Sequence, residues 1–113
     1  MWLLDVNIPL ALREFLEKHK ITVDTAESRG WRELENGDLV SAAMAAGFRC
    51  LLTRDKKIAH SAAKALGQSP DFSVVILTIN QVKEPIYLKQ FEDAWNKSPI
   101  TPIRGKVTPW PSP

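Results

Sequence analysis

The chain has 113 residues and a mass of 12.7 kDa, the size of a single domain with one modest core. Apolar residues make up 44% and charged residues 25%, the balance of an ordinary globular protein, which excludes a disordered, collagen-like or coiled-coil chain. The net charge of +2 does not on its own indicate nucleic-acid binding, and the single cysteine, Cys50, excludes an internal disulfide and a cysteine-rich zinc site.

The N-terminal segment from Trp2 to Leu4 is apolar and predicts a strand. Because the chain begins on this strand, we expect no cleaved signal peptide. No later apolar run approaches about 20 residues, the length that a membrane-spanning helix needs. These features predict a cytoplasmic protein that does not interact with a membrane.

Short apolar segments and longer segments of helical period alternate along the rest of the chain. Further strands are predicted at 21–23, 50–52 and 74–77, and helices begin near Pro9, Asn36, Ile58 and Asn80. Residues 50–52 and 74–77 are apolar at every position, as in strands that helices cover on both faces, whereas residues 21–23 alternate and are expected nearer an edge. The pattern predicts an α/β fold with a four-stranded, mostly parallel sheet in the order 2-1-3-4.

The composition changes near the C-terminus, because five of the eight prolines fall between Pro99 and Pro113. We therefore predict one domain over residues 1–98 and an extended tail over 99–113. Trp110 lies among these prolines, where no helix or central strand is expected. Either the tail is a mobile end, or burial of Trp110 anchors it to its own domain or to a second copy in a homodimer.

Acidic residues follow two of the predicted strands. Asp5 ends the first strand and Asp55 follows the third. In open α/β sheets, ligands bind beyond the carboxyl ends of the strands, where the strand order reverses. Two carboxylates at that point suit a hard cation such as Mg²⁺ or Mn²⁺. The alternative is that each aspartate caps the helix that follows it.

Three segments, taken in order, resemble the small PIN-like proteins that are related to the toxins of bacterial toxin–antitoxin pairs. They are Leu4-Asp5-Val6-Asn7-Ile8-Pro9, Asn36-Gly37-Asp38-Leu39-Val40 and Gly47-Phe48-Arg49-Cys50-Leu51-Leu52-Thr53-Arg54-Asp55. The resemblance covers roughly residues 2–95. It implies a three-layer α/β/α PIN-like fold and, for active members, RNA cleavage by clustered carboxylates that depends on Mg²⁺ or Mn²⁺. It also implies an antitoxin protein as partner.

The resemblance assigns the acids by position. Asp5 and Asp55 match metal ligands, and Asp38 matches the third acid of the same metal-binding, catalytic cluster, with Glu35 as its less favoured substitute. Many relatives carry a further acid where this chain has Lys57. A two-metal site would lack ligands, whereas a single Mg²⁺ needs only one or two carboxylates and water. Two functions stay open: a metal-dependent ribonuclease, or a scaffold that has lost catalysis and binds protein or RNA.

Polar and basic neighbours complete the predicted site. Asn7 and Thr53 are expected to hydrogen-bond the ligating carboxylates, the alternative being a turn asparagine and a strand threonine. The predicted RNA contacts are basic and aromatic side chains: Arg54, Lys56, Lys57, Arg32 and Trp31. The alternatives are solvated surface charges and, for the tryptophan, a residue that closes the core beneath a loop.

Overall fold

The computed structural model describes residues 1–68, 71–80 and 82–111. Strands and helices alternate along these ranges: β1 (Trp2–Leu4), α1 (Ala11–Lys18), β2 (Val23–Thr25), α2 (Asn36–Ala45), β3 (Cys50–Thr53), α3 (Ile58–Gln68), β4 (Ser73–Leu77), α4 (Glu84–Lys97) and β5 (Val107–Trp110). None of the helices in these ranges has the length and apolar character needed to cross a membrane.

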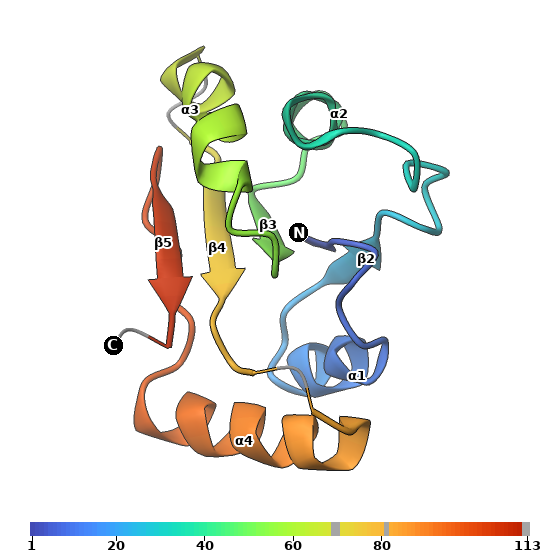
Figure 1. Cartoon of the computed structure of the whole chain (residues 1–113), viewed down its shortest axis with the longest axis vertical. Coiled ribbons are helices and arrows are strands. Elements are labelled where there is room, and N and C mark those ends of the chain that lie inside the picture. Colours follow the sequence, from blue (N-terminus) through green and yellow to red (C-terminus); the bar gives the residue numbers. More distant parts are fainter. Residues whose placement is uncertain (69–70, 81, 112–113) are drawn as a thin grey trace.

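The strands form one parallel sheet in the order β2-β1-β3-β4-β5 (Figure 1). The predicted α/β class and the order of the first four strands are confirmed. The predicted number of strands is wrong, because β5 adds a fifth strand from the segment predicted to be a tail. Pro109 lies opposite Ile76 of β4. Proline offers no amide hydrogen to a further strand, so it is tolerated on β5, which is an edge of the sheet.

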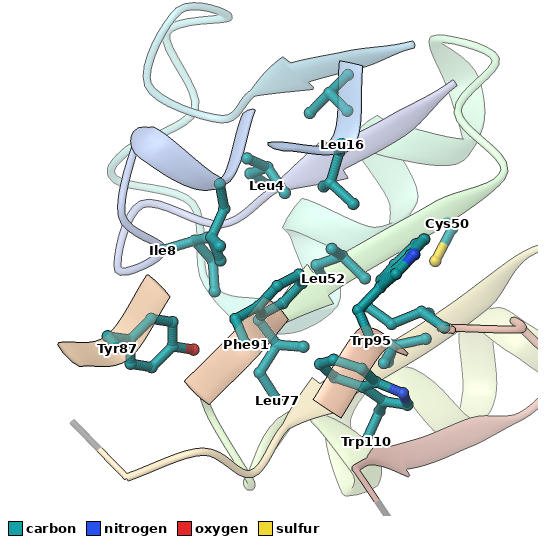
Figure 2. Packing of buried hydrophobic residues seen from close by; sticks show 14 residues of the cluster. Leu4, Ile8, Leu16, Cys50, Leu52, Leu77, Tyr87, Phe91, Trp95 and Trp110 are labelled. Atoms are coloured by element: carbon teal, nitrogen blue, oxygen red, sulfur yellow. The ribbon is translucent and has the colours of Figure 1, made fainter. Parts of the chain in front are cut away.

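Helices cover both faces of the sheet, and each face has its own hydrophobic cluster. Figure 1 shows α1 and α4 together below the strands, with α2 and α3 above them. Leu4 and Leu52 pack in one cluster with residues of α1 and α4, whereas Leu3 and Leu51 pack in the other with residues of α2 and α3 (Figure 2 shows the first cluster). Neighbouring strand residues separate in this way because successive side chains point to opposite faces. The specifically PIN-like form of this arrangement stays a prediction.

Trp110 anchors the C-terminal segment to the rest of the domain. Its side chain is buried, 7% exposed, and its ring centroid lies 4.9 Å from that of Phe91 and 6.2 Å from that of Trp95. The indole N–H donates a hydrogen bond to the carbonyl oxygen of Ser98 at 2.8 Å. Of the alternatives for this residue, burial against its own domain is the one found. A second copy of the chain stays a prediction.

Three predicted boundaries shift. The strand predicted at 21–23 is β2, which runs from Val23 to Thr25. Asn36 is the first residue of α2 rather than its cap, and extended Glu35 precedes it. The last helix begins at Glu84 instead of near Asn80, which places Pro85 in its first turn. Proline is favoured there because the first amides of a helix have no partner within it.

Candidate functional site

Asp5 and Asp55 lie at the carboxyl ends of two adjacent strands. Asp5 directly follows β1, and Asp55 comes two positions after Thr53, the last residue of β3. β1 and β3 are paired in parallel, so the predicted adjacency of these strands is confirmed. The sheet continues to β2 beyond β1 and to β4 beyond β3, so the strand order reverses between them. This is the position at which open α/β sheets bind ligands.

Thr53 connects the two acidic residues through one oxygen. Its side chain is fully buried. The hydroxyl donates to Asp5 Oδ2 at 2.7 Å and accepts from the backbone N–H of Asp55 at 3.1 Å. A hydroxyl has one hydrogen and two lone pairs, so it makes both bonds at once. Thr53 therefore holds the Asp5 carboxylate next to the start of the β3–α3 connection.

Asp55 is held by donors on both of its carboxylate oxygens. The Asn36 side-chain amide donates to Oδ2 at 2.9 Å, and the backbone N–H of Lys57 donates to Oδ1 at 2.9 Å. These two bonds, followed by the charge of Lys57, hold the pKa of Asp55 below its ordinary value despite the opposing effect of burial. These bonds therefore favour the ionised form of Asp55. One oxygen serves the turn before α3, in keeping with the capping alternative, and the other reaches across to α2.

Asn36 is a site residue that the sequence interpretation treated only as a helix cap. Nineteen positions separate it from Asp55. The signal that pointed to it was its place at the start of the second segment of the PIN-like resemblance. Asn7, in contrast, is exposed. Within the residues that the structure describes, no hydrogen bond joins its side chain to Asp5 or Asp55, and the second donor to Asp5 is the backbone N–H of Val6 at 2.8 Å.

The third predicted acid lies on a different element, α2. Asp38 is exposed in the first turn of α2, and Glu35 is exposed just before it. Across residues 1–68, 71–80 and 82–111, no group of three or more His, Cys, Asp or Glu side chains is placed to hold one metal ion. Two carboxylates fit a single Mg²⁺ or Mn²⁺ that completes its shell with water. They do not fit a two-metal clamp. A role for Asp38 stays a prediction.

The predicted RNA contacts fall into two groups. Arg54, Lys56 and Lys57 lie on the β3–α3 connection around Asp55, the two lysines exposed and Arg54 half-buried. The Arg54 guanidinium lies 5.7 Å from the centroid of the Tyr87 ring, within the range of a cation–π interaction. The other group lies elsewhere, in the loop between β2 and α2.

That loop uses its aromatic residue for packing. Trp31 is half-buried and lies edge-on to Phe48, with ring centroids 6.1 Å apart, against the cluster beneath α2 and α3. Arg32 is exposed and pairs with Glu27 at 3.3 Å. Trp31 thus has the contacts of a residue that closes the core beneath a loop.

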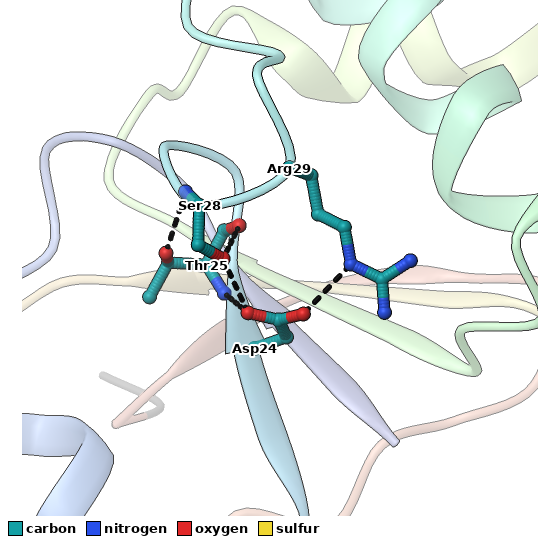
Figure 3. A network of polar contacts seen from close by, with 4 residues as sticks. All are labelled: Asp24, Thr25, Ser28 and Arg29. Carbon is teal, nitrogen blue, oxygen red and sulfur yellow. Dashed lines mark hydrogen bonds and ion pairs between the residues drawn. The ribbon is translucent and has the colours of Figure 1, made fainter.

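A polar network at the end of β2 holds the start of the same loop (Figure 3). Asp24 accepts hydrogen bonds from the Ser28 hydroxyl, from the Thr25 backbone N–H at 2.8 Å and from Arg29 Nε at 2.7 Å. The Ser28 bond, then those from Arg29 and Thr25 together with the Arg29 charge, outweigh burial and lower the pKa of Asp24 to about 2. Asp24 and Arg29 neutralise each other's charge within this network, so we assign the network a structural role.

A scan against models of protein families, a search of curated proteins and a search of solved structures each found no match to this chain. A function must therefore be argued from the residues and their geometry. The feature that supports one best is the pair of aspartates joined through Thr53.

Proposed function

We propose that this protein is a PIN-like ribonuclease that depends on Mg²⁺ or Mn²⁺, of the kind found as the toxin of a toxin–antitoxin pair. The observation that carries the proposal is the connection of Asp5 to Asp55 through Thr53 at the point where the strand order reverses. The resemblance of three segments to PIN-like proteins supports the same function, since both aspartates lie within those segments.

The protein's own residues would prepare the site as follows. Asp5 and Asp55 would hold one cation, which, when bound, neutralises charge on the scissile phosphate and makes a bound water more acidic. Thr53 donates a hydrogen bond to the Asp5 carboxylate and accepts one from the Asp55 backbone N–H, while the Asn36 amide helps to lower the pKa of Asp55. The exposed side chain of Lys56, beside Asp55, would bind RNA phosphates. Asp38, exposed in the first turn of α2, would complete the acidic cluster or orient the water.

A second function, that of a non-catalytic scaffold, is favoured by Lys57. Its charge helps to lower the pKa of Asp55, so it stabilises this carboxylate without a metal. Lys57 also occupies the position of a further acid in many PIN-like relatives. In this alternative the chain binds RNA or a protein without cleaving either.

Cleavage of an unstructured single-stranded RNA tests the two functions. The ribonuclease proposal expects cleavage with Mn²⁺ or Mg²⁺, none with a chelator, and none by Asp55→Asn under any of these conditions. Asp93→Asn is the matched control, since Asp93 is an exposed acid on α4 that pairs with Lys89 at 3.3 Å. Circular dichroism should show the same fold for all three proteins.

Lys57→Asp separates the alternatives further. If the site lacks only a ligand, restoring an acid at this position should increase the cleavage rate. RNA binding without metal-dependent cleavage, in both the wild type and Lys57→Asp, would establish the scaffold instead.

The toxin proposal also predicts partners and a location. We expect an antitoxin protein, encoded beside this chain, that binds it and suppresses cleavage in the cytoplasm. Co-expression of the two reading frames should yield a stable complex. A homodimer is a further prediction, and light scattering tests it.

A further inference from the structure

A cavity of about 380 Å³ lies next to the aspartate pair. Three parts of the chain line it: the β1–α1 connection, which contributes Ile8 and Pro9; Arg54, between Thr53 and Asp55; and the start of α4, which contributes Glu84 and Tyr87. Because Asp5 and Asp55 directly adjoin two of these parts in the sequence, the cavity opens beside the candidate metal site.

Tyr87 lines this cavity, and its buried hydroxyl makes no hydrogen bond within the part of the chain that the structure describes. Its side chain is 1% exposed. Figure 2 shows the ring at the end of the hydrophobic cluster below Ile8, well apart from Trp110. Burial raises the pKa of Tyr87, and a protonated hydroxyl of this kind can donate a hydrogen bond. A buried polar group without a partner calls for a ligand or an ordered water.

Two sources of positive charge, the Arg54 side chain and the first amides of α4, lie at the same cavity. The Arg54 guanidinium lies over the Tyr87 ring, and its charge opposes the effect of burial on the pKa of the hydroxyl. The 14-residue helix α4 begins at the cavity, and the first amides of a helix carry partial positive charge. Among the described residues that line the cavity, Glu84 is the one acid, and it is exposed.

We infer that this cavity binds a phosphate group of an RNA strand, one that neighbours the phosphate held at Asp5 and Asp55. The Tyr87 hydroxyl and the Arg54 guanidinium would donate to its oxygens, and Ile8 and Pro9 would contact the attached ribose. Donors of this kind bind phosphate strongly because each bond is assisted by the ligand's charge. The identity of the ligand as RNA rests on the proposed function, whereas its phosphate chemistry does not.

Tyr87 is the only tyrosine in the chain, so a single carbon-13 tyrosine label gives one NMR signal that reports on this cavity. The full-length protein is titrated in a chelator with adenosine monophosphate, inorganic phosphate and adenosine. We expect the monophosphate to shift the signal at the lowest concentration, inorganic phosphate at a higher one, and adenosine not at all. A response to adenosine alone, or to none of the three, would overturn the inference. Equal affinity for phosphate and the monophosphate would overturn the RNA assignment.

Variants test the donors. Tyr87→Phe keeps the ring and removes only the hydroxyl, and we expect adenosine monophosphate to bind about tenfold more weakly, by calorimetry, for the loss of one bond to a charged group. Arg54→Ala should weaken binding at least as much, while Arg13→Ala removes the same charge from α1 and should change nothing. Glu84→Gln should tighten binding of an anion. Weaker binding in Glu84→Gln, or unchanged binding in Tyr87→Phe, would contradict a phosphate site.

Failure of this inference can be told apart from failure of the proposed function. Binding of adenosine monophosphate should persist in Asp55→Asn, which keeps the cavity intact. Such binding without any RNA cleavage by the wild type would retain the phosphate site and reject the ribonuclease. Cleavage by the wild type that is undiminished in Tyr87→Phe, without a response of the tyrosine signal, would do the reverse.

Discussion

The hydroxyl of Thr53 is buried between two acidic residues and makes one hydrogen bond toward each. Valine has nearly the same shape without the hydroxyl. In Thr53→Val the Asp55 amide loses its acceptor and the Asp5 carboxylate loses a donor. We expect the free energy of unfolding to fall by about 1–3 kcal/mol, measured in urea.

Thr53→Ser is the matched control, because it keeps the hydroxyl and removes only a methyl group. It should retain whatever stabilisation Mn²⁺ confers, whereas Thr53→Val should lose part of it. If Thr53→Val proves as stable as the wild type, the threonine is an ordinary strand residue. Its two hydrogen bonds then contribute nothing to the free energy of unfolding.

Asp24 gives a pH-dependent test. Its pKa is about 2 in the fold against an ordinary 3.8, so the fold favours the ionised form. The resulting stability is present in full above about pH 4 and is lost as the pH falls toward 2. Its side chain is 22% exposed, and after allowance for solvent screening we expect Asp24→Asn to cost about 1 kcal/mol at pH 7. Urea unfolding at several pH values should show this difference shrinking below about pH 4 and vanishing only below pH 2.

Among the secondary-structure elements, β5 depends most on a single side chain. Trp110 packs against Phe91 and Trp95 of α4 and bonds to Ser98 at the end of that helix. Trp110→Ala should therefore lower the free energy of unfolding by about 3–5 kcal/mol in a denaturant titration. Ile103→Ala, at a half-exposed position in the same segment, is the control and should cost little. Equal losses for both variants would mean that β5 adds no specific packing.

For the protein as a whole, metal binding should appear as stability. A cation that binds only the folded chain raises the melting temperature. At a hundredfold excess over Kd it adds about 2.7 kcal/mol to the free energy of unfolding. We expect millimolar Mn²⁺ to stabilise the wild type but not Asp5→Asn. Without metal, Asp5→Asn should melt no lower than the wild type, because it removes the repulsion between the Asp5 and Asp55 charges while its amide oxygen still accepts from Thr53. If Mn²⁺ does not change the melting temperature of the wild type, both aspartates have only structural roles.

The sequence was sufficient for the α/β class, for the first four strands and for the acids at their ends. Cys50 to Leu52 are apolar at every position because helices cover both faces of β3, and that coverage can be recognised locally. Asp5 and Asp55 could be placed beside each other because strand ends in a parallel sheet share one edge.

Other features depend on contacts between distant parts of the chain. The proline-rich segment has no strand pattern of its own, and it becomes β5 because α4 returns the chain to β4 and the core accepts Trp110. The bond from Asn36 to Asp55 and the cavity at Tyr87 likewise exist only after α2 and α4 have packed. Hydrophobic periodicity predicts which face of an element is buried. It does not predict which side chains that face contacts, because those contacts are set by the packing of the assembled sheet and helices.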